Sequence, residues 1–332
     1  MPDKTLLLAA DMGATHSRFS IFTVMNSEDG PPKLSLLRSR KLFTTDYPGF
    51  SDLLQALQAS GLFEGLSVRR ASLAAAGPVA HGRCIPPNIP WHLEARTAET
   101  VLGLERCLLL NDFVAQGYAC LMAEDAHGRE ILDIKPVKPG RMEKDFPAAI
   151  MGAGTGLGQA IVLPDVPRVL ASEGGHGRFS FSDADELGFC AYLRKVRGRD
   201  DISPDMVLGG RGLSDLYNFI MGTHISAPGA TARLNAEPAR PGHDRVLAAY
   251  ARFYGRAAQN FALTSLCRRG LYIAGGMALR VPVLHHPAFI AEFEHNSVQR
   301  ALLKTIPIFH LESPDSGLWG AGLYGAIDGK IQ

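Results

Sequence analysis

Closely spaced cysteines are missing from this sequence. Its five cysteines are widely separated, and no two of them form a CxxC or CxC pair. Structural zinc sites and disulfide frameworks use such spacings, so the pattern argues against both and favours a reducing cytoplasm. We expect reduced and mostly buried thiols at these positions, which are Cys84, Cys107, Cys120, Cys190 and Cys267.

An excess of charge of either sign is also absent. The chain carries 34 Lys and Arg residues against 33 Asp and Glu residues, a formal net charge of +1. This balance gives no electrostatic footprint for nucleic acid or for an anionic membrane. The apolar run within residues 1–13 is too short for a signal peptide or a membrane span. We therefore expect a cytoplasmic protein with neither a nucleic-acid partner nor a membrane anchor.

What is present fits a globular α/β protein. The 332 residues are 46% hydrophobic and 20% charged, which is enough for two domains. Strand-like and helix-like segments alternate along the chain, which predicts the α/β class. We expect strands at residues 71–77, 106–110 and 271–276, and helices at residues 50–60, 111–122, 202–220, 244–270 and 316–327. Residues 127–147 and 225–245 are rich in proline, glycine and charge, so we expect surface excursions there.

Two segments share an unusual pattern. Residues 5–24 and 148–164 each consist of an apolar run, a turn of small residues and a second apolar run. The pattern predicts a strand, a turn and a strand in both places. Its repetition suggests a duplicated architecture.

The second of these turns reads GAGTGLG, and such a bare backbone often marks the close approach of a phosphate. It is not a dinucleotide fingerprint, because Leu157 and Gln159 stand where the third glycine would fall. It is not a Walker A loop either, because no G-K-[ST] ending follows.

Six short motifs follow one another along the chain in a specific order. They are DMGATHSR, NDF, GAGTGLG, EGGH, LYIAGG and GLWGAG. In this order and with this spacing they resemble the motifs of bacterial glucokinases, a family of the hexokinase and actin superfamily. Each motif alone is weak, but the ordered set is specific. No cysteine-rich motif follows His176 and no helix-turn-helix precedes Asp11, which separates the chain from the related repressors.

The resemblance implies a fold and a division of the chain. The fold would be a two-lobed actin-like ATPase, ribonuclease H-like, with a duplicated α/β domain and a central cleft for sugar and nucleotide. Residues 1–111 with 313–332 would form the small lobe, and residues 112–312 the large lobe. Closure on the sugar would exclude water and prevent hydrolysis of ATP. The family also implies a homodimer.

The resemblance further implies an ATP site. In the family both hairpins wrap the β- and γ-phosphates with backbone N–H groups, and the hydroxyls of Thr15 and Thr155 would add donors. Glycine suits this role because a Cβ would collide with phosphate oxygens. The implied ATP-binding residues are Asp11, Gly13, Ala14, Thr15, Gly152, Ala153, Gly154, Thr155, Gly156, Gly158, Gly275 and Gly276. The alternative for either turn is an ordinary glycine-rich hairpin.

Asp11 follows an apolar run, and a carboxylate at a strand end needs a partner. By resemblance it would face, through water, the Mg²⁺ that bridges the β- and γ-phosphates, since magnesium usually keeps several of its waters. The alternative is an aspartate that initiates a turn.

Asp112 is the expected catalytic residue. Phosphoryl transfer asks the protein to orient the nucleophile and accept one proton, and a carboxylate at a strand end beside Asn111 can do so. By resemblance this pair binds the sugar. The alternative is helix capping, which explains one of the two residues but not both.

Three further residues are expected to bind the sugar. Glu173 and His176 are three residues apart and can reach adjacent hydroxyls of one pyranose ring. Asn88 resembles the family's asparagine on the opposite wall of the sugar cleft. The alternatives are a polar surface turn for Glu173 and His176, half of a metal site, and turn chemistry for Asn88.

The chain departs from the family pattern in three places. Ala14 and His16 stand where the family usually has glycine and asparagine, and Asp205 stands where it has glutamate. The family's glutamate accepts hydrogen bonds from the sugar, so we expect a sugar contact from Asp205. The alternative is a first-turn acid in a helix capped by Ser203.

With these residues, the resemblance implies an ATP- and Mg²⁺-dependent kinase that phosphorylates the 6-hydroxyl of glucose and feeds glycolysis. One alternative is a kinase of another hexose, such as mannose, fructose or an amino sugar. The other is a non-catalytic sugar-binding or actin-like ATPase module, against which the intact Asp112 and both hairpins argue.

Overall fold

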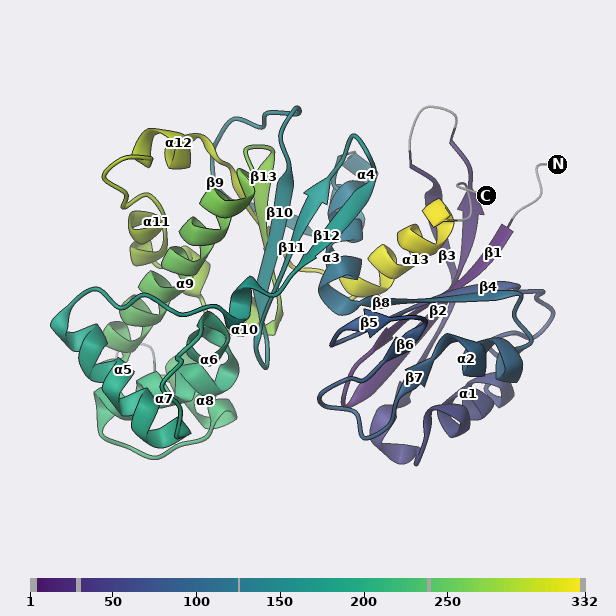
Figure 1. The fold of residues 1–332 in the computed structure, drawn as a ribbon, viewed down its shortest axis with the longest axis horizontal. Helices are drawn as coiled ribbons and strands as arrows, with labels where there is room; N and C mark the ends of the chain where they lie inside the picture. Colours follow the sequence, from purple (N-terminus) through teal and green to yellow (C-terminus); the bar gives the residue numbers. More distant parts are fainter. Residues whose placement is uncertain (1–4, 28–30, 125, 238–239, 329–332) are drawn as a thin grey trace. The chain divides into compact units, whose positions relative to one another are not determined.

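The chain forms two compact units in a computed structural model that describes residues 5–27, 31–124, 126–237 and 240–328 (Figure 1). Unit 1 combines Met1–Leu132, Val166–Val169 and Ser313–Gln332, and unit 2 combines Asp133–Asp165 and Leu170–Glu312. The expected division after residue 111 differs from this one, since residues 112–132 belong to unit 1. The ends of the expected small lobe, residues 1–4 and 329–332, lie outside the described residues.

Unit 1 is built on a mixed sheet with the strand order β3-β2-β1-β4-β8. β1 pairs antiparallel with β2, and it pairs in parallel with β4, which in turn pairs in parallel with β8. These strands are β1 (Thr5–Met12), β2 (His16–Met25), β3 (Lys33–Phe43), β4 (Arg70–Ala75) and β8 (Arg106–Asn111). A small sheet comprises β5 (Val79–Ala80), β6 (Arg83–Cys84) and β7 (Leu93–Glu94). The helices are η1 (Thr44–Asp46), α1 (Phe50–Ala59), α2 (Ala95–Leu102), α3 (Asp112–Met122), α4 (Ala126–Ile131) and α13 (Ser316–Asp328).

Helices cover both faces of this sheet because its strands are apolar on both sides. Leu8 and Met12 of β1 share a buried core with Leu53 of α1. Leu7 points the other way, since successive side chains of a strand alternate, and it lies against Gly325 of α13. Figure 1 accordingly shows α1 and α2 on one face of the sheet and α13 on the other.

The glycines of α13 permit a close crossing with α3. A Cβ on Gly320 would overlap the carbonyl of Ala115 in α3, so the two helices meet backbone to backbone. The expected closing helix at residues 316–327 is thus present, and its small residues fit α3 and the sheet.

Unit 2 contains a second mixed sheet with the order β12-β11-β10-β13-β14-β9. Its strands are β9 (Ile134–Lys138), β10 (Ala148–Ala153), β11 (Leu157–Leu163), β12 (Arg168–Ser172), β13 (Gly270–Ala274) and β14 (Ile308–Leu311). The helices are η2 (Gly174–His176), α5 (Ala184–Arg197), α6 (Pro204–Leu208), α7 (Gly210–Met221), α8 (Ala227–Ala236), α9 (His243–Ser265), α10 (Gly276–Arg280), η3 (Val283–His285), α11 (Pro287–Phe293) and α12 (Arg300–Thr305).

The core of unit 2 lies between this sheet and α9. Val246, Tyr250, Phe253 and Ala257 recur at helical spacing along α9 and are buried in one cluster with Met151 of β10.

The two units repeat one arrangement. In each, an antiparallel hairpin (β1–β2 or β10–β11) is followed by a strand that pairs in parallel with its first strand (β4 or β13). The predicted α/β class and the two predicted hairpins are confirmed.

Three segments differ from the expectation. The helix predicted at residues 202–220 is divided at Gly209, whose extended ψ of 163° separates α6 from α7. Residues 127–147 contain most of α4 and all of β9, which pairs with β14. Residues 225–245 contain α8 and the start of α9, while residues 238–239 lie outside the described residues. The described residues of both segments lie mostly at the surface as expected, but the segments contain regular structure that their composition did not predict, because tertiary pairing overrides local composition.

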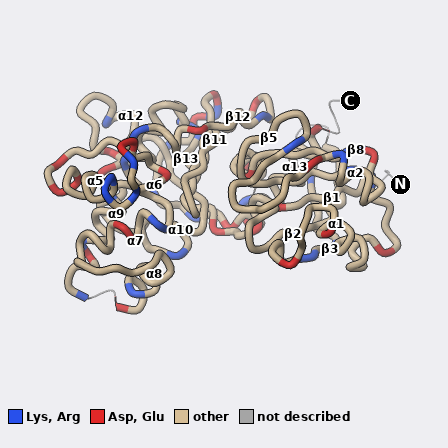
Figure 2. The backbone as a smooth tube through the Cα atoms, turned by 60° about the horizontal axis from the view of Figure 1, so that its bottom comes forward, with Lys and Arg blue, Asp and Glu red and all other residues tan. Residues whose placement is uncertain are grey.

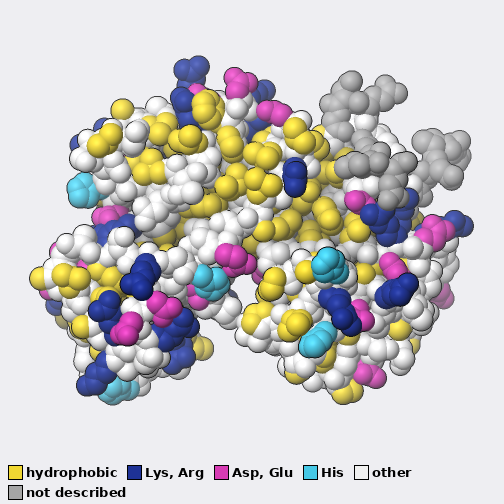
Figure 3. All heavy atoms as spheres, in the orientation of Figure 1, with side chains coloured by type: hydrophobic (Ala, Val, Ile, Leu, Met, Phe, Trp, Pro, Cys, Tyr) yellow, Lys and Arg dark blue, Asp and Glu magenta, His cyan; other side chains and the backbone are white. Residues whose placement is uncertain are grey.

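Charges of both signs are interspersed along the two units (Figure 2). In the space-filling view, the face of unit 2 over α5 and α7 likewise carries basic and acidic side chains together (Figure 3). No helix within the described residues is long and apolar enough to span a membrane.

Candidate active site

The turn of the first hairpin is held by Thr44. Gly13 N–H donates to the carbonyl of His16 over 3.0 Å, and a Cβ on Gly13 would lie only 2.8 Å from that oxygen. The Thr44 hydroxyl donates to the Gly13 carbonyl over 2.7 Å, and its N–H donates to the Thr15 carbonyl over 3.0 Å. Ala14 and Thr15 are exposed at the tip. The turn therefore presents its backbone outward from a fixed base.

Asp11 lies where β1 leads into this turn. Its carboxylate is 3.7 Å from the Arg18 guanidinium, and its side chain is 29% exposed. Burial raises the pKa of Asp11 to about 6; the Arg18 charge lowers it, and the charges of Asp112 and Asp315 raise it further. A second cation beside Asp11 would favour its ionised form.

The parallel strands of unit 1 bring Asp11 and Asp112 to one edge. In the register, Met12 of β1 pairs with Ala75 of β4, which pairs with Asn111 of β8. The carboxyl ends of β1, β4 and β8 therefore meet. The Asp112 charge contributes to the raised pKa of Asp11, which agrees with this placement.

Asn111 caps α3 and anchors a neighbouring loop. Its Oδ1 accepts from the N–H groups of Phe113 at 2.9 Å and Val114 at 3.2 Å, and its Nδ2 donates to the Gly77 carbonyl at 3.1 Å. Asp112 follows as the first residue of α3, half-buried, with its Oδ1 2.9 Å from the Phe113 N–H. Capping thus accounts for Asn111, as the sequence allowed for one of the pair.

The loop that carries Asn88 is anchored in the core of unit 1. Trp91 is stacked on Phe50, with 5.8 Å between ring centroids, and its indole N–H donates to the Tyr47 carbonyl. Asn88 is exposed. Cys84 of the preceding strand is buried, and its pKa is raised to about 11 by burial first and by the Asp112 charge second.

The turn of the second hairpin contains glycines of two kinds. A Cβ on Gly152 would lie 2.5 Å from the Ala274 carbonyl, and one on Gly156 would overlap the Asp205 carboxylate. A Cβ on Gly154 would have no atom of the described residues within 4 Å. Packing therefore explains Gly152 and Gly156 but leaves Gly154 with space on its outer side.

Buried groups hold this turn from behind. Ala153 N–H donates to the hydroxyl of Tyr254, a fully buried residue of α9, over 3.1 Å. Gly275 has φ +88° and lies against the Ala153 carbonyl, where a Cβ would come within 2.6 Å. Gly158 follows the turn in β11, paired with Gly152, and Gly276 begins α10. Thr155 is exposed at the tip.

Glu173 and His176 lie at the two ends of the short turn that follows β12 and contains η2. Their side chains are 74% and 63% exposed, and the His176 Nε2 lies 3.6 Å from the Glu173 Oε2. Between them, a Cβ on Gly175 would overlap the Leu157 carbonyl of β11. This turn is therefore packed on the second hairpin, with both polar side chains facing solvent.

Asp205 is hydrogen-bonded within unit 2. Ser203 caps α6 as expected, accepting from Met206 N–H. The Asp205 Oδ1 accepts a 2.8 Å hydrogen bond from the N–H of Leu157.

The expected residues thus group within each unit. Unit 1 holds Asp11, Gly13, Ala14, Thr15, Asn88, Asn111 and Asp112, and unit 2 holds residues 152–156, Gly158, Glu173, His176, Asp205, Gly275 and Gly276. Thr44 and Tyr254 support these groups but were not anticipated. They lie in ordinary strand, turn or helix contexts with no motif, so only the tertiary contacts reveal them.

Comparisons with known proteins connect this arrangement to described families. A family model described as Glucokinase matches residues 8–327. The glucokinase of Synechocystis sp. is 30% identical, over 96% of this chain and 97% of that protein. A glucokinase from Balamuthia mandrillaris in complex with glucose has a TM-score of 0.78 at 20% identity, covering 98% of this chain and 94% of that one. A ROK family glucokinase from Streptomyces griseus in complex with glucose and AMPPNP has a TM-score of 0.59 at 18% identity, covering 96% and 99%. The likeness to the solved structures confirms the expected actin-like ATPase fold.

Proposed function

The chain belongs to the glucokinase family and phosphorylates glucose with ATP, and we propose that Asp112 is the general base for this reaction. The Asp112 carboxylate accepts the proton of the 6-hydroxyl as that oxygen attacks the γ-phosphorus of ATP. The bond between the γ-phosphorus and the β,γ-bridging oxygen breaks, and ADP leaves.

The place of Asp112 carries this proposal. It is a half-buried carboxylate at the carboxyl end of a parallel strand, directly after Asn111. Asn111 already supplies the cap of α3, so helix capping does not account for the acid beside it. Phosphoryl transfer needs a residue that orients the hydroxyl and takes one proton, and a fixed carboxylate can do both.

Four polar residues are proposed to bind the sugar with Asp112. Asn111 is rigid, because its amide is bonded to the start of α3 and to Gly77. Glu173 and His176 expose an acceptor and a donor on one packed turn, which suits adjacent hydroxyls. Asn88 is exposed on an anchored loop.

The turns of the two hairpins are proposed to bind the phosphates of ATP. The residues in this role are Asp11, Gly13, Ala14, Thr15, Gly152, Ala153, Gly154, Thr155, Gly156 and Gly158, with Gly275 and Gly276 beside the adenosine. The open space at Gly154 and the exposed hydroxyls of Thr15 and Thr155 support this assignment.

The residues of unit 1 fit the Mg²⁺ that ATP implies. Magnesium keeps several waters and needs only one or two carboxylates beside phosphate oxygens. Asp11 offers one partly buried carboxylate; its pKa is raised chiefly by burial, and a bound cation would stabilise its ionised form. The described residues contain no cluster of three metal-binding side chains, and such a cluster is not required here. When bound, Mg²⁺ would neutralise charge on the β- and γ-phosphate oxygens.

A coupled assay over a panel of hexoses tests the substrate. With ATP and Mg²⁺, we expect the highest kcat/KM for glucose and lower values for mannose, fructose and glucosamine. A higher kcat/KM for another hexose would overturn the choice of glucose. Absence of turnover with all of them, in a folded protein that binds glucose, would favour a binding module.

A cytoplasmic homodimer that supplies glycolysis completes the proposal. All five cysteines lie among the described residues and are free and buried, which suits a reducing compartment. Sedimentation equilibrium tests the dimer: we expect twice the 35.8 kDa mass of the chain.

A further inference from the structure

The Asp205 carboxylate accepts a hydrogen bond from the turn of the second hairpin. The Asp205 Oδ1 accepts from the Leu157 N–H over 2.8 Å, and Leu157 is the first residue of β11. The same oxygen occupies the place that a side chain on Gly156 would need. Asp205 therefore touches two consecutive residues of the turn.

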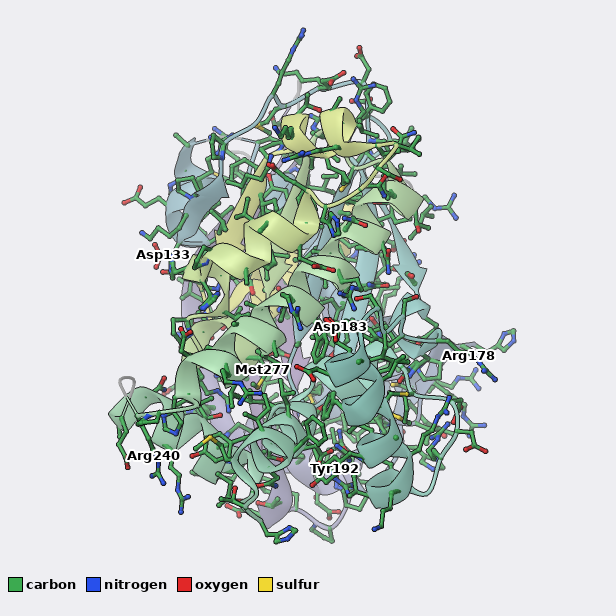
Figure 4. The ribbon with its side chains drawn as sticks, turned by 90° about the vertical axis from the view of Figure 1, so that its left-hand side faces the viewer. Asp133, Arg178, Asp183, Tyr192, Arg240 and Met277 are labelled. Carbon is green, nitrogen blue, oxygen red and sulfur yellow. The ribbon has the colours of Figure 1, made fainter. Side chains whose placement is uncertain are left out.

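The junction of α6 and α7 contacts the other side of the same turn. Gly210 N–H donates to the Gly154 carbonyl over 2.9 Å, and a Cβ on Gly209 would overlap the Thr155 carbonyl. Met277 of α10, labelled in Figure 4, lies behind Gly210, with its sulfur 3.5 Å from the position of a Cβ there. Residues 154–157 therefore contact Asp205 on one side and the start of α7 on the other.

We propose that Asp205 is a positioning residue for the phosphate-binding turn and not a ligand of the sugar. Its carboxylate fixes the peptide between Gly156 and Leu157, which sets the direction of the neighbouring N–H groups at the tip. This inference rests on the proposed role of the turn in binding ATP phosphates. The proposal also explains why aspartate stands here in place of the family's glutamate. The Asp205 side chain is short, and its carboxylate already lies within hydrogen-bonding distance of the turn.

Kinetics of Asp205→Ala separate the two roles. Loss of a hydrogen bond to a charged acceptor corresponds to about ten- to hundredfold in affinity. We expect KM for ATP to rise by that factor while the Kd for glucose, measured by calorimetry without nucleotide, stays within about twofold. Asp205→Asn keeps an acceptor of the same length, so it should restore KM for ATP to within about threefold of wild type. Asp201→Asn is the matched control, since Asp201 is exposed and its carboxylate is hydrogen-bonded to Arg199 two residues before it.

Hydrogen exchange gives a readout without substrate. In the free protein the Leu157 amide should exchange at least tenfold faster in Asp205→Ala than in wild type, and Asp201→Asn should leave it unchanged. This measurement does not depend on ATP binding. A failure of the proposed function would leave the exchange result intact while the wild-type enzyme showed no ATP-dependent turnover.

Gly156→Ala tests the same contact from the other side. With Asp205 present, the new methyl group would displace the carboxylate, so KM for ATP should rise. In the Asp205→Ala background the methyl group finds room, so the double variant should be no worse than Asp205→Ala. This non-additivity is the mark of direct contact. The proposal is overturned if the two changes add independently, or if Asp205→Ala weakens glucose binding and leaves both KM for ATP and Leu157 exchange at wild-type values.

Discussion

Two adjacent polar residues at the end of β8 have separate tasks. Asn111 uses its amide for the fold, since it caps α3 and holds the Gly77 carbonyl. Asp112 comes one position later, where a second cap has no function. Replacing Asn111 should therefore lower stability by about 0.5–2 kcal/mol for a lost N-cap, in addition to any loss of sugar affinity, whereas replacing Asp112 should lower the rate of the chemical step and leave stability close to wild type.

Asp112→Asn tests this separation. The amide keeps the shape of the side chain but is a far weaker base, and a positioned general base contributes about 10²–10⁴-fold. We expect kcat to fall by that factor, with glucose binding and melting temperature close to wild type. Retention of more than a few tens of per cent of kcat would show that Asp112 is not the base. Asn111→Ala serves as the contrast, because it should lower the melting temperature.

The ionisation of Asp11 should make the stability of the folded chain depend on pH. Its pKa is about 6 in the folded chain, above the ordinary value of 3.8, chiefly because of burial. The folded state therefore holds this proton more tightly than the unfolded state, and ionisation of Asp11 removes stability as pH rises from about 4 through 6.

Asp11→Asn removes that ionisation. Without nucleotide and Mg²⁺, the variant should melt at a higher temperature than wild type at pH 8 and at the same temperature at pH 4. The activity of Asp11→Asn should be strongly reduced, because a functional residue that destabilises the folded state often becomes more stable but less active when it is replaced. A variant that melts below wild type at pH 8 would contradict the assignment of burial as the dominant influence.

At the scale of the element, the turn of the second hairpin contains glycines of two kinds. Some have no room for a side chain because other parts of the protein pack against them, and one, Gly154, has open space beside it. A Cβ on Gly152 would meet the Ala274 carbonyl, whereas in the described chain nothing lies within 4 Å of one on Gly154. Gly154→Val should therefore fold normally and raise KM for ATP far more than KM for glucose, because a branched side chain would stand where phosphate oxygens approach.

Steady-state kinetics with each substrate varied in turn measure this difference. Gly152→Val is the contrasting variant, since its side chain would meet the protein itself and should lower the melting temperature. An equal rise in both KM values for Gly154→Val, with the fold intact, would argue against a phosphate at this turn.

Elements with a local cause were predictable from the sequence. Both hairpins follow from apolar runs around small residues, and α3 follows from Asn111 before a helical pattern. The division of residues 202–220 was not predictable, because it depends on the Thr155 carbonyl packing against Gly209. β9 was missed for the same reason: its pairing with β14 is set by tertiary structure.

The candidate site shows the same limit. Motif order identified the residues of both turns, and comparison with the family identified the activity. The partner of Asp205 was not visible, since an acid in the first turn of a helix has the same local signature whether it faces solvent, a sugar or Leu157. Thr44 and Tyr254 act through single contacts that no local pattern encodes.

At the scale of the whole molecule, unit 1 is made from distant parts of the chain. The helix α13 packs on the sheet that contains β1 and β4. In the sequence, however, the unit 2 residues 170–312 lie between these strands and α13. The crossing of α13 with α3 depends on Gly320, which leaves no room for a Cβ beside the Ala115 carbonyl.

Gly320→Val should therefore loosen unit 1 selectively. Overpacking of this kind costs about 1–3 kcal/mol, and hydrogen exchange should speed up in β1, β4 and α3 while α9 keeps its protection. Gly188→Val in α5 is the matched control, because Gly188 is exposed and a Cβ there would lie 3.5 Å from the Phe219 side chain, an ordinary van der Waals distance. Uniform loss of protection across both units would contradict the assignment of α13 to unit 1.

The split of unit 1 also has a consequence for biosynthesis. β1, β2 and β4 leave the ribosome early, but the helix that covers one face of their sheet is translated only after residue 312. Unit 2 is translated in between, so its own core is complete while Leu7 and its neighbours still lack their cover. Domains fold as units during synthesis, and bare apolar strands are prone to aggregate. We therefore expect the amino-terminal sheet of the nascent chain to be prone to aggregation until α13 has been synthesised.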